Sequence, residues 1–312
     1  MTTMPLFSYP TTIGLIDDDQ LFLKALSRML SHDYLLQTFQ DSYEALNFFE
    51  SYKPVLSSMS FLRGCPEYDS YDAAEHMPVD LNAEALMNLR KYPERCRDIS
   101  VLVVDYNMPN MNGLELCRKL YGLPIKKILL TGAVDHTEAV EAFNEGLIDR
   151  FVRKDNPRLI EEIQTHLIAL MRQNFIDNTR GLLSHLEADH PLPISDSLFS
   201  AFFKNWCATH NISEHFLLDK QGNFILVDNK GEIFYFIVHT DKTLSTFVEL
   251  HEEDEEVADL INAVSKRKLI PFFGPGKEPW QKKESEWSSH FYVPEIFEGK
   301  EKYFWTAIKG NV

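Results

Sequence analysis

The chain has 312 residues, 44% of them hydrophobic, so it is long enough for two domains that each bury a core of their own. Its formal net charge of −16 argues against nucleic-acid binding, because such binding needs clustered lysine and arginine. No run of about 18 uncharged apolar residues is present, and the first residues lack a signal-peptide pattern, so we expect a cytoplasmic protein with no membrane segment. The four dispersed cysteines predict neither a zinc site nor a disulfide framework.

The first half of the chain alternates short apolar strands with amphipathic helical segments. The expected strands are 13–16, 35–39, 101–104, 127–130 and 150–152. The expected helices are 20–31, 41–52, 113–121 and 137–144. Such alternation is typical of a parallel sheet covered by helices. We therefore predict the α/β class, with a doubly wound five-stranded parallel sheet.

Residues 54–98 interrupt this alternation, because a short connection between the second helix and the third strand would suffice. We interpret them as an insertion. Its first part is rich in turn-forming residues, whereas 80–91 has the apolar spacing of a helix. A surface elaboration at one edge of the sheet, a dimer contact and a lid over the site are all open alternatives.

Apolar residues continue at helical spacing over about 157–187 and predict one long helix. Its first half can cover the sheet, whereas its second half needs another apolar partner, either a second domain or a second copy of the chain. We therefore divide the chain into a domain at 1–156, a long linking helix that continues it at 157–190, and a second domain at 191–312.

The second domain begins with a predicted helix at 196–210 and continues with three strands separated by tight-turn sequences. The expected strands are 216–218, 223–227 and 232–239, followed by helices at 243–250 and 255–265 and strands at 290–293 and 302–308. This order predicts an α+β domain built on an antiparallel meander. The segment contains no motif that identifies an output chemistry.

Polar side chains follow four of the strands predicted in the first half. The acidic run Asp17 to Asp19 ends the first strand, Asp105 ends the third, Thr131 ends the fourth, and Lys154 lies just beyond the fifth. Because the carboxyl ends of parallel strands share one edge of a sheet, we expect these side chains to converge. Clustered carboxylates repel one another, and a hard divalent cation such as Mg²⁺ relieves the repulsion. The pattern thus predicts Mg²⁺-assisted transfer of a phosphoryl group to a carboxylate.

The segment 102–113, Leu-Val-Val-Asp-Tyr-Asn-Met-Pro-Asn-Met-Asn-Gly, closely resembles the receiver domain of two-component response regulators. The resemblance covers about 12–172 apart from the insertion. It implies a flavodoxin-like fold and a regulator rather than a classical enzyme. The phosphoryl donor would be a sensor histidine kinase or a phosphotransfer protein, and Asp105 would be the phosphoacceptor.

The same resemblance implies further roles at the predicted edge of the sheet. Asp18 would ligate Mg²⁺ directly, Asp17 directly or through water, and Asn107 through its backbone carbonyl. Asp105 would also be a ligand.

On the other side of the phosphoryl group, Thr131 would bond it and Lys154 would pair with it. Phe151 would be the switch residue that turns inward as Thr131 moves. Two positions depart from the family pattern. Gly132 stands where a small Ala or Ser is usual, and Asp155 stands where a proline is usual, so the exact placement of Lys154 does not follow from the resemblance.

A phosphatase similar to the haloacid dehalogenase group is a remote enzymatic alternative. It would use Asp17, Asp19, Thr131 and Lys154 as nucleophile, acid/base and phosphate contacts. This alternative leaves Asp105 without a role, and the acidic pair that it requires after Lys154 is replaced by the long helix.

Two hypotheses remain for the second domain. It is either an interaction or ligand-binding module, with phosphorylation controlling homodimer formation through the long helix, or an unrecognised DNA-binding domain of a transcriptional regulator. The segment 139–151, together with the insertion and an output without a DNA-binding motif, resembles the response regulators of bacterial quorum-sensing circuits that use α-hydroxyketone signals.

Overall fold

The structure is a computed structural model, which describes residues 4–55, 62–63, 80–81, 83–132, 136–186, 191–253, 255–275 and 284–310. The chain forms two compact units, each composed of several segments. The N-terminal unit comprises Tyr9–Met59 and Tyr92–Asn178. The C-terminal unit comprises Met1–Ser8, Ser60–Lys91 and Thr179–Val312. Two segments expected in the first domain, 1–8 and 60–91, therefore group with the second.

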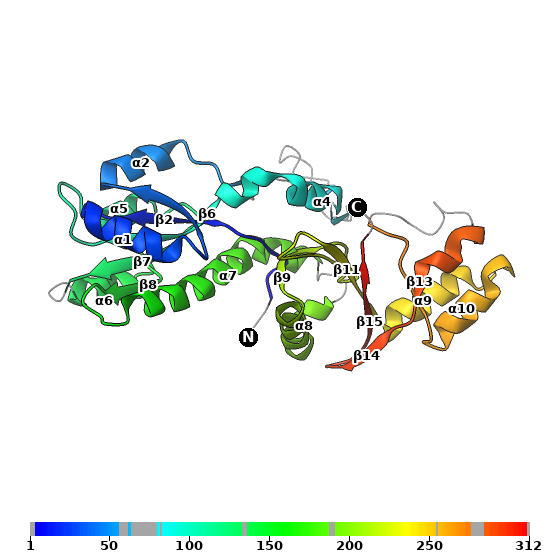
Figure 1. The fold of residues 1–312 in the computed structure, drawn as a ribbon. Helices are drawn as coiled ribbons and strands as arrows, with labels where there is room; N and C mark the ends of the chain where they lie inside the picture. The colour runs from blue at the N-terminus through cyan, green and yellow to red at the C-terminus, as the bar shows by residue number, and fades with distance from the viewer. Residues whose placement is uncertain are drawn as a thin grey trace, which may run out of the picture. The chain divides into compact units, whose positions relative to one another are not determined.

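A five-stranded parallel sheet forms the centre of the N-terminal unit (Figure 1). Its strands are β2 (Thr12–Ile16), β3 (Leu35–Phe39), β6 (Ile99–Asp105), β7 (Lys126–Thr131) and β8 (Arg150–Arg153). Their order in the sheet is β3-β2-β6-β7-β8, and every neighbouring pair is parallel. This arrangement confirms the predicted doubly wound, flavodoxin-like sheet.

Helices cover both faces of this sheet. On one face, α1 (Gln20–Leu30) and the first part of α7 (Leu159–Leu186) pack on β2, β6, β7 and β8. On the other face lie α2 (Ser42–Glu50), α5 (Gly113–Lys119) and α6 (His136–Asn144), and the short 3₁₀ helix η1 (Pro93–Arg97) precedes β6. In α1, Leu23, Leu26 and Leu30 are buried at helical spacing, whereas Leu21 is 80% exposed.

The C-terminal unit is built on a six-stranded antiparallel sheet. Its strands are β1 (Phe7–Ser8), β9 (Ile212–Leu217), β10 (Phe224–Asp228), β11 (Ile233–Thr240), β14 (Glu295–Glu298) and β15 (Lys302–Lys309). Their order is β1-β9-β10-β11-β15-β14, with antiparallel neighbours throughout. The predicted meander is present as β9, β10 and β11, and the α+β class of this half is confirmed.

Helices also pack on both faces of the second sheet. Aromatic side chains of α8 (Ser197–Thr209) contact one face, and α9 (Asp241–His251) and α10 (Ala258–Ser265) cover the other. The remaining elements are the 3₁₀ helices η2 (Pro193–Ser195), η3 (Glu255–Val257) and η5 (Glu284–His290) and the strands β12 (Ile270–Pro271) and β13 (Phe291–Tyr292). The strand expected at 290–293 is shorter than predicted, because His290 ends η5 and only two residues pair with β12.

The described part of the insertion contains β4 (Leu62–Arg63), β5 (Asp80–Leu81) and α4 (Ala83–Lys91). The helix begins later than predicted, because Asp80 and Leu81 pair with β4. Helix α4 contacts β9. The insertion thus contributes to the C-terminal unit, and most of its turn-rich first part lies outside the described residues.

The N-terminal strand β1 was not expected from the sequence. It pairs with β9, and Leu6 and Phe7 are almost fully buried. From Thr179 onward, α7 also belongs to the C-terminal unit, where Leu186 is buried. The second half of the long helix therefore finds its apolar partner within the chain. Among the described residues, no helix combines the length and the apolar character needed to cross a membrane.

Candidate functional site

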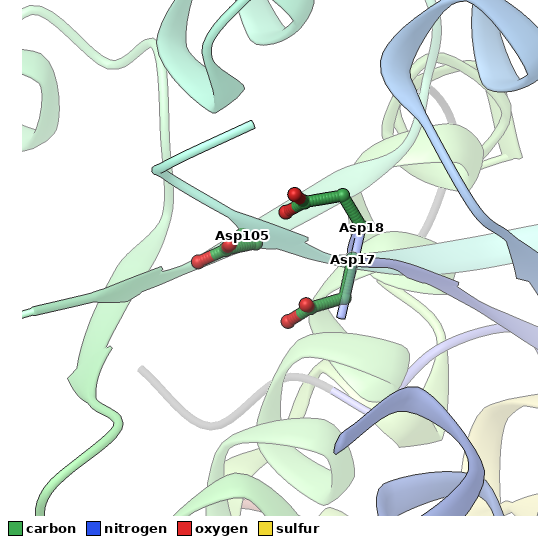
Figure 2. A group of neighbouring side chains, drawn as sticks. All are labelled: Asp17, Asp18 and Asp105. Atoms are coloured by element: carbon green, nitrogen blue, oxygen red, sulfur yellow. The ribbon is translucent and has the colours of Figure 1, made fainter. Parts of the chain in front are cut away.

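Three carboxylates converge at the carboxyl edge of the parallel sheet. Asp17 follows β2, Asp18 is the next residue, and Asp105 ends β6. One oxygen of each lies within 4.8 Å of one oxygen of the other two, and Figure 2 shows the three groups projecting toward the same space. Asp17 and Asp105 are 1% and 4% exposed, whereas Asp18 is exposed. The oxygen-only donor set fits a hard divalent cation such as Mg²⁺.

Lys154 is the cation of this site. Its Nζ lies 2.7 Å from Oδ2 of Asp17 and 2.9 Å from Oδ1 of Asp105. The departure from the family pattern at position 155 does not displace it. Asp155 instead forms a bidentate ion pair with Arg153, with distances of 3.0 Å and 2.6 Å to Nε and Nη2. Both side chains of this ion pair are exposed, and the two residues flank Lys154 in the chain at the end of β8.

The site combines buried carboxylates with an ammonium of opposite charge, and both influence the pKa values there. Burial raises the pKa of the Asp17 carboxyl above its usual value. Lys154 opposes this shift, while the negative charge of Asp105 adds to it. Burial alone would lower the pKa of Lys154. The hydrogen bonds to Asp17 and Asp105 have a larger effect in the opposite direction, so the pKa of Lys154 is raised. Lys154 therefore remains an ammonium and compensates part of the carboxylate charge.

The hydroxyl of Thr131 lies at the end of β7 and is fully buried. Among the described residues its Oγ1 has no hydrogen-bond partner, which is costly unless a bound group accepts or donates there. Its backbone carbonyl accepts from Lys154 N at 2.9 Å, so the two residues are adjacent at the edge of the sheet. Gly132 follows it, and residues 133–135 lie outside the described part.

Two predicted site residues remain: Phe151, the expected switch residue, and Asn107, an expected metal ligand. Phe151 pairs with Leu129 in the sheet and is half-buried against the core that α5 and α6 cover. Because side chains alternate along a strand, Thr131 and Phe151 point to the same face. Asn107 is exposed two residues after Asp105. The structure brings Asp17, Asp18, Asp105 and Lys154 together, with Thr131 next to them; Asn107 and Phe151 lie nearby in the chain and in the sheet.

The connection from β6 to α5 depends on Gly113. A Cβ at this position would lie 2.2 Å from the carbonyl oxygen of Asp105, closer than real Cβ contacts come. Gly113 N also donates to the carbonyl of Tyr106 at 2.9 Å, and Asn112 caps α5 by accepting from Glu115 N. The glycine at the end of the 102–113 segment thus lets the chain fold back closely over Asp105.

Two contacts at the site could not be anticipated from the sequence. The ring of Phe22 on α1 lies beside Lys154, with its centroid 4.6 Å from Nζ. The hydroxyl of Tyr106, the residue after Asp105, donates to Glu138 on α6. Phe22 belongs to the apolar stripe of a helix, and nothing in that pattern distinguishes it from an ordinary core residue.

Comparisons with known proteins identify the kind of domain that carries this site. A family model for the response regulator receiver domain matches residues 73–164, which include Asp105, Thr131 and Lys154. The cyclic di-GMP phosphodiesterase response regulator RpfG of Xanthomonas campestris is 35% identical over 88 residues, 27% of this chain and 23% of the relative. The transcriptional regulatory protein FixJ of Rhizobium meliloti is 42% identical over 76 residues, 22% of this chain and 37% of the relative. The chain thus covers only a minor share of both relatives.

A solved structure extends the similarity to nearly the whole chain. The response regulator LqsR of Legionella pneumophila matches with a TM-score of 0.77 and 26% identity. The match covers 99% of this chain and 90% of that one, so it includes both the parallel sheet with its site and the C-terminal unit.

Proposed function

The chain carries a receiver domain of the response regulator family, and on this premise we propose that it acts in a two-component phosphorelay with Asp105 as the phosphoacceptor. The donor is a sensor histidine kinase or a phosphotransfer protein in the cytoplasm. One observation supports the proposal above all: Asp17, Asp18 and Asp105 lie together at the sheet edge, with the Lys154 ammonium between two of them.

Each residue of the site has a chemical task in this transfer. A carboxylate oxygen of Asp105 forms a bond to phosphorus, while the bond to the donor atom breaks and the donor keeps the electron pair. Asp17, Asp18 and Asp105, with the backbone carbonyl of Asn107, would hold Mg²⁺. When bound, Mg²⁺ would supply positive charge that offsets the charge of the phosphoryl oxygens.

Lys154 and Thr131 act on the remaining phosphoryl oxygens. Lys154 already lies within 3 Å of Asp105, so a small movement of its side chain suffices to pair with an acyl phosphate there. The unpartnered hydroxyl of Thr131 donates to another oxygen. Because Phe151 points to the same face as Thr131, a shift of Thr131 opens space into which its ring can turn, and this motion is the switch.

The test is the intact mass of the full chain after incubation with acetyl phosphate. We expect a gain of one phosphoryl group, about 80 Da, that requires Mg²⁺ and is lost when the metal is chelated. Borohydride reduction followed by peptide mapping locates the acyl phosphate, and we expect it at Asp105. A Mg²⁺-independent gain, or a modified residue elsewhere, would contradict the proposal.

The C-terminal unit is an interaction or ligand-binding module in this proposal. The overall similarity to a Legionella response regulator and the resemblance of 139–151 favour a role in bacterial quorum sensing. No observation on the described residues favours the DNA-binding alternative or the phosphatase alternative.

We further propose that phosphorylation promotes a homodimer. Because Leu186 is buried, the second half of α7 no longer argues for a second chain. Several apolar side chains of the N-terminal unit are nevertheless exposed, among them Phe143 at 42% and Ile168 at 65%. Light scattering with and without beryllium fluoride as a phosphoryl mimic measures the assembly. We expect the mass to rise from that of one chain to that of two, and an unchanged mass at tens of micromolar protein contradicts the dimer.

A further inference from the structure

Phe22 lies in the first full turn of α1, and its backbone is tied to the carboxylate cluster. Asp19 caps α1, and its side chain accepts hydrogen bonds from Leu21 N and Phe22 N at 2.9 Å and 3.1 Å. The backbone N–H of Asp19 in turn donates to Oδ1 of Asp17 at 2.9 Å. The position of the Phe22 backbone is therefore fixed relative to Asp17 through two hydrogen-bonded steps.

The alternation of side chains along the strands explains why Phe22 can reach Lys154. Leu15, Val103 and Val152 point to the face that α1 and α7 cover. Asp17, Asp105 and Lys154 each follow two residues later in the chain and so continue toward the same face. Phe22, half-buried on α1, packs against this core and borders the charged groups at its edge.

The ring of Phe22 differs from the other partners of the ammonium. Lys154 Nζ contacts two carboxylates and lies 4.6 Å from the centroid of the ring. A divalent cation would compete for Asp17 and Asp105 and weaken their hold on Lys154. The face of an aromatic ring attracts an ammonium through its quadrupole, yet it offers no ligand to Mg²⁺. The ring is thus a contact that Lys154 keeps when the carboxylates are ligated.

We propose that Phe22 is a positioning residue for Lys154: the face of its ring holds the ammonium beside Asp105 while the carboxylates turn to the metal ion. The inference rests on the proposed function. In the step concerned, a carboxylate oxygen of Asp105 bonds to phosphorus, the phosphorus–oxygen bond to acetate breaks, and acetate leaves with the electron pair. Phe22 does not touch the phosphoryl group and acts only through Lys154.

The experiment compares Phe22→Leu with Phe22→Tyr in the full chain. Leucine keeps an apolar side chain of similar burial but has no quadrupole, whereas tyrosine keeps the ring. We measure the initial rate of mass gain over a range of acetyl phosphate concentrations with Mg²⁺. We expect the maximal rate of Phe22→Leu to fall about three- to tenfold at an unchanged half-saturating donor concentration, and Phe22→Tyr to stay near the native rate.

Phe48→Leu is the matched control, because Phe48 is a partly exposed ring on α2 that contacts other aromatic side chains and, within the described part of the chain, no ammonium. We expect the Phe48→Leu variant to accept the phosphoryl group at the native rate. A Phe22→Leu variant that folds and reacts as fast as the native chain overturns the proposal. A Phe22→Tyr variant as slow as Phe22→Leu overturns it as well, since the ring would then not be the active feature.

A second measurement separates this proposal from the proposed function. Urea unfolding of Phe22→Leu is compared in the native and the Lys154→Met backgrounds, which isolates the coupling between the two side chains. We expect the substitution to change the unfolding equilibrium constant about three- to tenfold more in the native background. If the native chain accepts no phosphoryl group, the proposed function fails, and the unfolding comparison still decides whether the ring holds Lys154. Equal effects in both backgrounds overturn the proposal.

Discussion

Asp105→Asn is expected to accept no phosphoryl group from acetyl phosphate in the presence of Mg²⁺. The amide keeps nearly the shape of the carboxyl group but has no anionic oxygen to attack phosphorus, and it removes one of three clustered charges from the metal site. The fold should persist, because Asn can still accept a hydrogen bond from Lys154, which also keeps its 2.7 Å contact with Asp17. Intact mass before and after incubation measures the loss, and the thermal midpoint checks the fold.

Asp41→Asn provides the control for this variant. Asp41 caps α2 by accepting hydrogen bonds from Tyr43 N and Glu44 N, and asparagine is an equally good cap. The Asp41→Asn substitution removes one negative charge from the same unit at a position outside the cluster. We therefore expect this variant to gain the same mass as the native chain. If Asp105→Asn gained a phosphoryl group at the native rate, Asp105 would not be the acceptor, and the roles proposed for the neighbouring residues would be wrong.

Lys154→Met is expected to lower the free energy of unfolding of the N-terminal unit by about 3 kcal/mol near pH 7 without metal, because the removal of one partner leaves buried carboxylates uncompensated. Lys154 is 26% exposed at its side chain, whereas Asp17 and Asp105 are 2% and 5% exposed, so water replaces the ammonium poorly. Urea unfolding measures the loss. The same variant should accumulate the acyl phosphate at least about tenfold more slowly.

The stability deficit of Lys154→Met should depend on pH. Burial already raises the pKa of Asp17 in the native chain, and without the ammonium that pKa should rise further. A carboxyl group with a raised folded-state pKa binds its proton more tightly in the folded than in the unfolded chain. Stability therefore falls as pH rises from the unfolded value of about 4 through the folded one. We expect the deficit to shrink as pH falls from neutral toward the unfolded pKa.

Lys24→Met serves as the control here, because Lys24 is an exposed lysine on α1. Its stability should change little, and its pH dependence should follow that of the native chain. A Lys154→Met variant as stable as Lys24→Met at neutral pH would mean that the carboxylates are already protonated or hydrated in the native chain. The electrostatic account of the site would then be wrong.

Several features of the fold were predictable because they depend on local pattern. Strands β2, β6 and β7 contain short apolar runs, and every strand of the parallel sheet is followed by a helical segment, so the element order and the class follow from local pattern. Caps such as Asp41 mark the helix starts. The convergence of Asp17, Asp105, Thr131 and Lys154 was predictable for a different reason: parallel strands place their carboxyl ends at one edge, whatever the side chains are.

Long-range pairing was not predictable. Strand β1 has only two paired residues, too few for any periodicity, and its partner β9 lies about 200 residues further along the chain. The two units divide within α7, but the helical spacing of apolar residues continues across the division and does not predict it. The insertion likewise has the spacing of a helix at 83–91, but the spacing does not say that this helix contacts β9.

The sequence by itself determined the class of the sheet, the residues at its carboxyl edge and the chemistry that clustered carboxylates, a hydroxyl and an ammonium can perform. These depend on side-chain type and on the fixed geometry of parallel strands. Only the tertiary structure decided that Lys154 pairs with Asp17 and Asp105 and borders the ring of Phe22, and that the N-terminal strand joins the second sheet. Those outcomes depend on distances between segments far apart in the chain, which packing of the whole unit sets and no local pattern encodes.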